Sequence, residues 1–400
     1  MNYSPLIKTG LVIAFLTGLA INLSTSIQNI MVAVFLVASV FSPYLRDALR
    51  QAVKNGFIRA AVGLYLLLVL GTLWGDAPLS DRLSMLLRFI LYLLSPLVYV
   101  YFYYSPNVKA FFLGFASCVL LSVLLSILSS LSGLDFFHPS TGIHTQFVGL
   151  KIDLFRGHVY QNYFAGLLSA VLLVLLFEGQ IKERVHRMVA IALLLLLFVD
   201  VFFFVTGRTG HILYVLMVVI IALYYMKRAR LRVLAGLLLL MIPITLYLSP
   251  HIQDGINRAI SDLNLYEAGE ANTSIGLRLT FYKNSLMLIE RSPLYGHGTG
   301  SFRYEYERLH DKVMRSVGNP HSDYLWFAVE LGAIGLAGFI LFLSVGIWQS
   351  LHTPRPYGLL AFVLIITYAV SSVTNSFFTD NITGQFFILA LCALMAEGKS

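Results

Sequence analysis

The sequence predicts an all-α polytopic membrane protein with about 12 transmembrane helices. The first observation behind this prediction is composition. Apolar residues make up 58% of the 400 residues and charged residues only 12%, about half the share that is usual in soluble proteins. A soluble globule could not bury so much apolar surface, so the composition excludes a soluble multidomain protein. The second observation is that the apolar residues are gathered into runs of roughly 20 residues, the length of a helical span.

These apolar runs follow one another along the whole chain and contain few charges. They cover approximately residues 7–24, 28–45, 57–75, 83–104, 109–131, 161–178, 188–206, 210–226, 232–249, 323–346, 358–375 and 383–397. A transmembrane β-barrel would instead show alternating segments of about 10 residues. The first run could pass for a signal peptide, but no convincing cleavage site follows it, so we expect it to remain as the first helix.

The positive charges predict the orientation of the bundle. More than half of the 28 Lys and Arg residues fall in the two tails and in loops on the same side as the N-terminus. Cytoplasmic loops carry such an excess, so both termini are expected in the cytoplasm. The same distribution explains the net charge of +8 without nucleic-acid binding. Cys118 and Cys392 both lie in apolar runs, so neither a disulfide nor a cysteine metal site is predicted.

The chain divides into three predicted regions. Residues 1–249 hold nine spans and residues 323–400 hold the last three. Between them, residues 250–322 form an outer loop that is long enough to fold against the membrane surface.

Local signals predict that this outer loop is partly helical. Ser274 is a suitable N-cap for a helix over residues 275–291, and Pro293 ends that helix. A glycine-rich turn over residues 296–300 then leads to a second predicted helix over residues 302–316.

Two arginines at the outer face are candidates for binding an anion. Arg208 lies among glycines in Thr206-Gly-Arg-Thr-Gly210, where backbone and guanidinium could approach a phosphate together. An arginine at the end of a span is also a common anchor in the lipid interface. Arg278 lies near the N-terminus of the 275–291 helix, with Tyr282 one turn further on the same face. A solvated helix face is the alternative interpretation of that pair.

His321 stands where the outer loop returns to the membrane. A neutral imidazole can take a proton from a hydroxyl group near neutral pH, which makes His321 a candidate general base. A polar anchor at the interface is the alternative. Asp323 is not an obvious partner for orienting the His321 ring, because side chains two positions apart on a helix point in different directions.

Further polar residues are weaker candidates for substrate contact. They are Arg156, His158, Gln161 and Asn162 before span six, Arg88 inside an apolar run, and Tyr282, Gly296 and Gly298 in the outer loop. Asp200 also lies inside an apolar run, where ionisable groups are costly and often functional. A polar re-entry turn, or a bond to a neighbouring helix, explains these residues about as well.

Several motifs that would indicate other chemistry do not occur in the sequence. It contains no Walker A loop, no Asp-x-Asp, no His-Glu-x-x-His and no Cys/His ligand set. We therefore expect no ATP hydrolysis, no metal site and no other cofactor.

An ordered set of motifs over about 60 residues resembles the shared segment of the O-antigen ligase and O-antigen polymerase superfamily. The motifs read Gly-Leu-Arg278-Leu-Thr-Phe-Tyr, Arg291-Ser-Pro-Leu-Tyr-Gly296-His-Gly298-Thr-Gly-Ser-Phe, His321-Ser-Asp-Tyr-Leu325 and Glu330-Leu-Gly332-Ala-Ile-Gly335-Leu. The span layout and the large outer loop extend the resemblance over the whole chain. Ser322 departs from the pattern, because the family usually has Asn there.

The resemblance implies an O-antigen ligase with its active site at the periplasmic face of a Gram-negative inner membrane. The donor would be a polysaccharide on undecaprenyl diphosphate, and the acceptor a sugar hydroxyl of lipid A-core. His321 would be the general base, and Arg208 and Arg278 would bind the diphosphate without a metal. Direct displacement of this kind predicts inversion at the anomeric carbon.

Three alternatives remain open at this point. The same superfamily includes O-antigen polymerases, which extend lipid-linked glycan repeats, and protein O-oligosaccharyltransferases. A secondary transporter is the alternative from another class, because about 12 helices is common among transporters. A transporter would place its substrate site near the bilayer midplane, whereas the polar candidates here gather at the outer rim.

Overall fold

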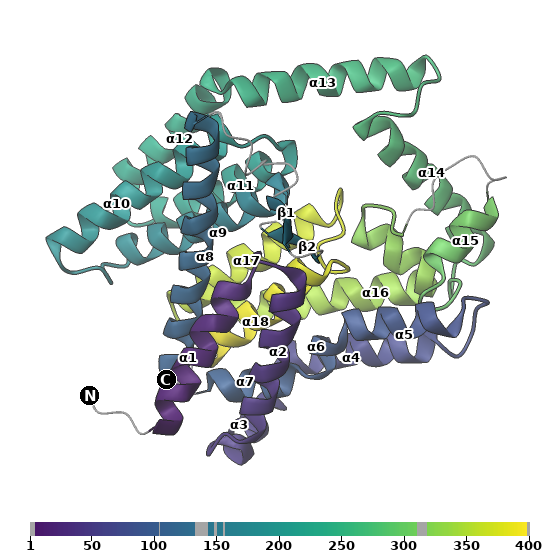
Figure 1. The fold of residues 1–400 in the computed structure, drawn as a ribbon, viewed down its shortest axis with the longest axis horizontal. Helices are drawn as coiled ribbons and strands as arrows, with labels where there is room; N and C mark the ends of the chain where they lie inside the picture. Colours follow the sequence, from purple (N-terminus) through teal and green to yellow (C-terminus); the bar gives the residue numbers. More distant parts are fainter. Residues whose placement is uncertain are drawn as a thin grey trace.

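The computed structural model describes residues 5–103, 105–132, 143–147, 150–154, 157–309 and 318–397, and within these ranges the chain is predominantly helical (Figure 1). The first part contains α1 (Pro5–Ala20), α2 (Thr25–Val40), α3 (Leu45–Ala52), α4 (Gly56–Gly71), α5 (Leu79–Arg88), α6 (Ile90–Leu93), α7 (Ser95–Phe102) and α8 (Ser105–Ser132). An antiparallel pair follows, β1 (Ile143–Phe147) and β2 (Leu150–Leu154), with Ile143 opposite Leu154.

The second part of the chain returns to helices. It contains α9 (His158–Phe177), α10 (Arg184–Val199), the π-helical turn η1 (Asp200–Phe204), α11 (Arg208–Met226), α12 (Arg232–Leu248), α13 (Pro250–Glu267), α14 (Ser274–Arg291), α15 (Phe302–Leu309), α16 (Asp323–Leu351), α17 (Tyr357–Ser371) and α18 (Asn381–Glu397). The predicted helical class is therefore confirmed, and the short hairpin is an addition that the sequence did not predict.

Five helices among the described residues are long and apolar enough to cross a membrane. They cover Pro106–Ser129, Val159–Phe177, Arg184–Phe204, Arg208–Met226 and Asp323–Leu351. The number rises to seven if two bent pairs, α2 with α3 (109°) and α12 with α13 (65°), each count as one span. The other predicted spans coincide with shorter apolar helices or with the broken run α5–α6–α7. A helix of 16 residues such as α4 extends only about 24 Å, less than the hydrocarbon core of roughly 30 Å.

Small residues let the first helix pack closely against α8. A Cβ atom added at Gly18 would collide with the backbone oxygen of Phe111, and one added at Gly114 would collide with that of Phe15. Close approach through small residues is typical of helix packing in membranes, where lipid gives no hydrophobic drive for association.

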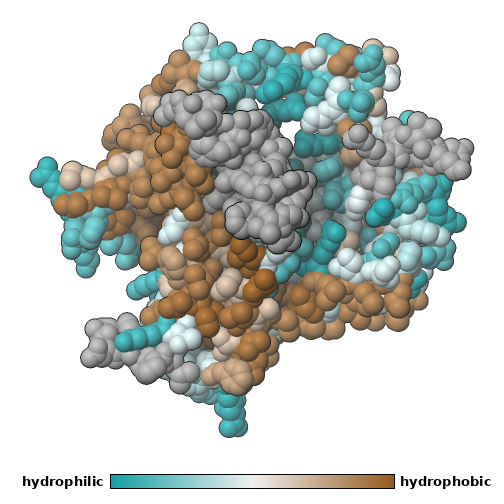
Figure 2. Space-filling view, in the orientation of Figure 1, coloured by the Kyte–Doolittle hydropathy of each residue, from teal (hydrophilic) through white to brown (hydrophobic). Residues whose placement is uncertain are grey.

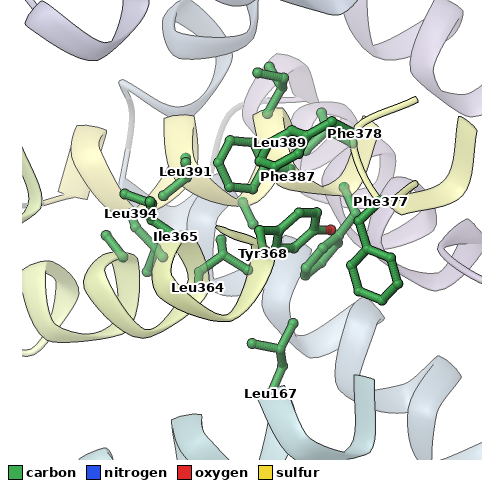
Figure 3. Close-up of a cluster of buried hydrophobic side chains, with 14 of the residues drawn as sticks. Leu167, Leu364, Ile365, Tyr368, Phe377, Phe378, Phe387, Leu389, Leu391 and Leu394 are labelled. Carbon is green, nitrogen blue, oxygen red and sulfur yellow. The ribbon is translucent and has the colours of Figure 1, made fainter. Parts of the chain in front are cut away.

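An aromatic cluster joins the last two helices and the loop between them (Figure 3). The Tyr368 ring of α17 lies 4.6 Å from the Phe387 ring of α18, and the Phe378 ring of the connecting loop lies 4.7 Å from Phe387. These side chains are buried, so they hold the helices together through close van der Waals contact. The loop is thereby fixed to the core of the bundle.

A break in α16 receives the glycine-rich turn of the outer loop. Gly332 has φ 63° and ψ −153°, which opens the helix ladder. The turn fills the gap: the backbone N–H of His297 donates to the Val329 oxygen at 3.0 Å, and that of Gly298 donates to the Glu330 oxygen at 2.7 Å. The tight turn therefore belongs to the packing of α16.

The Glu330 side chain completes this junction. Its carboxylate is fully buried and accepts hydrogen bonds from the backbone N–H groups of Gly300 and, at 2.8 Å, Phe302. Phe302 is the first residue of α15, so the carboxylate satisfies donors that the helix itself cannot. The Glu330 side chain thus holds the glycine-rich turn and the start of α15 against α16.

The outer loop covers one side of the molecule. In Figure 1, α13 extends from the end of α12 towards α14. Figure 2 shows hydrophilic residues over α13 and around the hollow beside α14, whereas hydrophobic residues cover most of the left part and the edge below the hollow.

The two helices predicted in the outer loop are present. The N-cap of α14 is Thr273, one residue before the predicted cap, and its Oγ1 accepts from the Gly276 N–H at 3.1 Å. The second predicted helix is described as far as Leu309, and the rest of it lies outside the described residues.

Replacing Gly332 by alanine is expected to lower the stability of the protein by about 1–3 kcal/mol. The positive φ is unfavourable for alanine, and its Cβ would collide with the Leu294 carbonyl. Thermal unfolding of purified protein in detergent measures the effect. Gly63→Ala is the control, because the added Cβ has no heavy atom within 4 Å and the position is helical. A G332A protein that melts at the wild-type temperature would contradict this account of the break.

Candidate active site

A polar cavity with a volume of about 540 Å³ lies among the described residues. It lies between α14, the loop that joins α17 to α18, and the ends of α5 and α9. Its lining residues are Thr25, Arg88, Val159, Tyr160, Ser274, Arg278, Asn319, His321, Asn375, Ser376, Phe377, Thr379, Asp380, Asn381 and Ile382. Segments that are far apart in the sequence therefore meet at one site, and it contains two of the three predicted catalytic residues.

Arg278 brings a partly buried positive charge to the cavity. It lies one turn into α14, close to the positive end of the helix dipole. Burial lowers the pKa of Arg278 from its ordinary value, Tyr282 raises it, and the positive charge of Arg208 lowers it. A bound anion would relieve both the desolvation and the repulsion, so this wall of the cavity favours an anionic ligand.

His321 presents an imidazole beside this guanidinium. Its backbone has φ 55°, and its N–H donates to Asn319 Oδ1 at 3.0 Å. The ring stacks on Phe281 with centroids 5.8 Å apart. Burial lowers the pKa of His321, and the positive charge of Arg278 lowers it further. The imidazole is therefore neutral at neutral pH and able to accept a proton.

The other two arginines occupy different positions around the cavity. Arg88 ends α5 and lines the cavity with an exposed side chain. Arg208 begins α11 and is not a lining residue; its Nη2 lies 3.6 Å from Asp262 Oδ2. Asp262 also accepts the Ile275 N–H at 3.3 Å, so it connects Arg208 to the start of α14. Arg208 Nη1 is buried without a hydrogen-bond partner among the described residues.

The first turn of α9 holds two of the weaker candidates, Gln161 and Asn162, whose predicted contact with substrate stays a prediction. Gln161 is buried and donates to Asp200 Oδ2 at 2.9 Å. Asn162 is buried and donates to the Thr206 oxygen at 3.3 Å. Both side chains therefore serve contacts between helices, and the cavity is lined by Val159 and Tyr160 of this segment. Arg156 and the side chain of His158 lie outside the described residues.

The remaining candidates in the outer loop hold the site together. Tyr282 donates from its hydroxyl to the Val373 oxygen at 2.9 Å, which fastens α14 to the α17–α18 loop. A Cβ atom at Gly296 would lie 2.5 Å from the Glu330 carbonyl, and one at Gly298 would collide with the Trp74 oxygen. The two glycines are thus accounted for by packing, and their predicted contact with substrate stays a prediction.

Comparison with known proteins matches the segment that holds Arg278 and His321. Residues 193–340 match the family model described as O-antigen ligase. The resemblance to the O-antigen ligase family is confirmed. A 153-residue segment is also 26% identical to an uncharacterized protein of Haemophilus influenzae and covers 35% of this chain. The match spans only 38% of that relative's own length.

The segment that matches this family model holds Arg208, Arg278 and His321, but most of the residues that line the cavity lie outside it. Seven of the 15 lining residues lie between Asn375 and Ile382, after the matched segment. Sequence reasoning missed this loop. The available signal was a polar stretch, Thr374-Asn-Ser and Thr379-Asp-Asn, between two spans at the predicted outer face.

The described residues of this chain contain no group of three or more His, Cys, Asp or Glu side chains placed to hold a metal ion. The metal-independent reaction stays a prediction, and a transfer assay in the presence of chelator tests it.

Arg278→Gln is expected to raise the pKa of His321, because the depression caused by the positive charge disappears while burial remains. The pH dependence of diethyl pyrocarbonate modification at His321, followed by mass spectrometry, reports this pKa, since only the neutral imidazole reacts. Lys283→Gln removes the same charge from an exposed position on α14 and is the matched control. Equal modification midpoints in wild type and R278Q would contradict the proposed charge coupling.

Proposed function

We propose that this multi-pass membrane protein is an O-antigen ligase. It transfers polysaccharide from undecaprenyl diphosphate to a sugar hydroxyl of lipid A-core. The observation that carries the proposal is the cavity in which His321 and Arg278 lie together, since it combines a neutral base with an anion-binding cation. The family match over residues 193–340 supports the reaction class.

The proposed location is the Gram-negative inner membrane, with the cavity at the periplasmic face. In this arrangement the chain crosses the membrane about 12 times, both termini are cytoplasmic, and residues 250–322 form a periplasmic loop. The excess of Lys and Arg in the loops on the N-terminal side supports the orientation. The correspondence between the predicted apolar runs and the helices supports the layout.

His321 acts as the general base. One imidazole nitrogen takes the proton of the acceptor hydroxyl while that oxygen attacks the anomeric carbon of the donor glycan. General base catalysis of this kind accelerates a reaction by about 10²- to 10⁴-fold. The depressed pKa of His321 suits the role, because the base is already deprotonated at neutral pH.

The arginines bind and neutralise the departing diphosphate. As the new glycosidic bond forms, the bond between the anomeric carbon and the diphosphate oxygen breaks, and negative charge grows on that oxygen. Arg278, Arg88 and the N-terminus of α14 face the cavity where the charge develops. Arg208 adds positive charge behind Arg278. Attack opposite the leaving group inverts the anomeric carbon.

Replacing His321 by alanine is expected to lower transfer by about 10²- to 10⁴-fold, because the hydroxyl loses its base. Purified protein is mixed with undecaprenyl diphosphate-linked polysaccharide and lipid A-core, with chelator and without nucleotide, and the products are resolved on a lipopolysaccharide gel. The exposed His186→Ala is the matched control.

The product of the wild-type protein decides between the possible reactions. A ladder on lipid A-core supports a metal-independent ligase. Lengthened lipid-linked glycan without attachment to core would indicate a polymerase instead, and products seen only with protein acceptors would indicate an O-oligosaccharyltransferase. Full activity of H321A would remove His321 from the mechanism.

The rate of transfer is expected to fall as the pH falls through the pKa of His321, because the protonated imidazole cannot accept a proton. Burial and Arg278 lower that pKa, so the midpoint of the acid limb is expected below pH 6.5. The initial rate at saturating donor and acceptor, measured across the pH range, gives the midpoint. A midpoint at or above pH 6.5 would contradict the assignment.

A further inference from the structure

The segments that line the cavity differ in charge. Arg88 of α5 and Arg278 of α14 bring positive charge, whereas the segment 372–382 contains neither Lys nor Arg. That segment instead offers amide and hydroxyl side chains, together with the carboxylate of Asp380. Asp380 is held in place, because its Oδ2 accepts from the Tyr160 hydroxyl at 3.0 Å and its Oδ1 accepts from the Ile382 N–H at 2.9 Å. A surface of this composition repels a diphosphate and suits a neutral ligand rich in hydroxyl groups.

The α17–α18 loop is fixed by a buried carboxylate that the mechanism does not use. Asp323 is fully buried at the start of α16. Its Oδ2 accepts from Ser372 Oγ at 2.8 Å and from the Phe378 N–H at 3.0 Å. Its Oδ1 accepts from Thr379 through both the N–H, at 3.2 Å, and Oγ1, at 3.1 Å. The Asp323 side chain is therefore hydrogen-bonded to both ends of the loop, and we call this set of bonds the Asp323 clamp.

The same clamp connects the loop to the proposed base. Asp323 is two residues after His321, and its backbone N–H donates to the Ser372 oxygen at 3.0 Å. Asn319 Oδ1 accepts both from the His321 N–H, at 3.0 Å, and from Ser376 Oγ, at 2.9 Å. The position of the loop and the position of the imidazole are thus set by one hydrogen-bonded network.

The aromatic core holds the loop from the other side. Phe377 lines the cavity, and its ring lies 5.0 Å from that of Tyr163 and 5.4 Å from that of Tyr368 (Figure 3). A surface that is already ordered before binding loses little conformational entropy when a ligand binds.

We propose that the α17–α18 loop, residues 372–380, is the subsite that seats the sugar ring of the acceptor, and that Asp323 is the positioning residue that sets this subsite relative to His321. The donor diphosphate then occupies the part of the cavity lined by Arg88 and Arg278. This inference rests on the proposed transferase function and adds to it the place of the acceptor.

The test separates acceptor binding from donor binding with three variants. Asn375→Ala removes a lining amide whose Nδ2 donates only to the adjacent Thr374 hydroxyl among the described residues, so the fold is expected to tolerate it. Ser372→Ala removes one of the four bonds to Asp323. Asp323→Asn keeps the size of the side chain but replaces one carboxylate oxygen with an NH₂ group. That group cannot accept from the N–H groups of Phe378 and Thr379.

The readouts are the acceptor KM with lipid A-core at saturating donor, the kcat, and the Kd of undecaprenyl diphosphate. We expect the acceptor KM to rise about 3- to 10-fold in N375A and S372A and more in D323N, which also lowers kcat. The Kd of undecaprenyl diphosphate is expected to stay at the wild-type value. Ser350→Ala, a buried serine at the other end of α16, is the control for a purely structural effect.

Two results would overturn the inference in different ways. If wild type transfers but N375A and S372A leave the acceptor KM unchanged, or weaken diphosphate binding equally, the subsite assignment is wrong and the transferase function stands. If wild type forms no product from the two substrates, the proposed function fails and the acceptor subsite fails with it.

Discussion

Two buried carboxylates on α16 determine the geometry of the whole site. Glu330 bonds the backbone of the turn that ends α14 and begins α15, and Asp323 bonds the backbone of the α17–α18 loop. Burying a carboxylate is costly unless hydrogen bonds compensate it, and here backbone N–H groups supply that compensation on both sides. Because main-chain groups are among the partners of both, the two carboxylates fix the path of the turn between α14 and α15 and that of the α17–α18 loop.

The sequence predicted the parts of this structure that depend on local patterns. The helical class and the positions of the apolar runs follow from composition and run length, which need no knowledge of tertiary contacts. His321 and Arg278 were recognised because their residue types, their order and the neighbouring motifs indicate chemistry. Both line one cavity, although their catalytic roles still await the experiments.

The parts that the sequence did not predict depend on contacts between distant residues. Asp323 was not recognised as part of the site, because its partners Ser372 and Thr379 are about 50 positions further along the chain. The amide of Gln161 could bind a sugar as far as the sequence indicates. Its hydrogen bond to Asp200 becomes apparent only when η1 is seen to pack beside α9. The number of spans is likewise not fixed by hydropathy alone, because helices such as α4 are shorter than the bilayer core.

The break at Gly332 divides α16 into two pieces with different attachments. The piece from Asp323 to Leu331 is bonded to the outer loop and to the α17–α18 loop. The piece after Gly332 is bonded to the outer loop through the N–H groups of Ala333 and Ile334. Backbone groups freed by the break are satisfied by the inserted turn, so the helix is interrupted without exposing polar atoms to lipid. A single continuous rod would transmit any tilt of the bundle directly to His321. Because the inserted turn is bonded to both pieces of α16, we expect the proposed base to keep its place relative to the outer loop when the spans tilt.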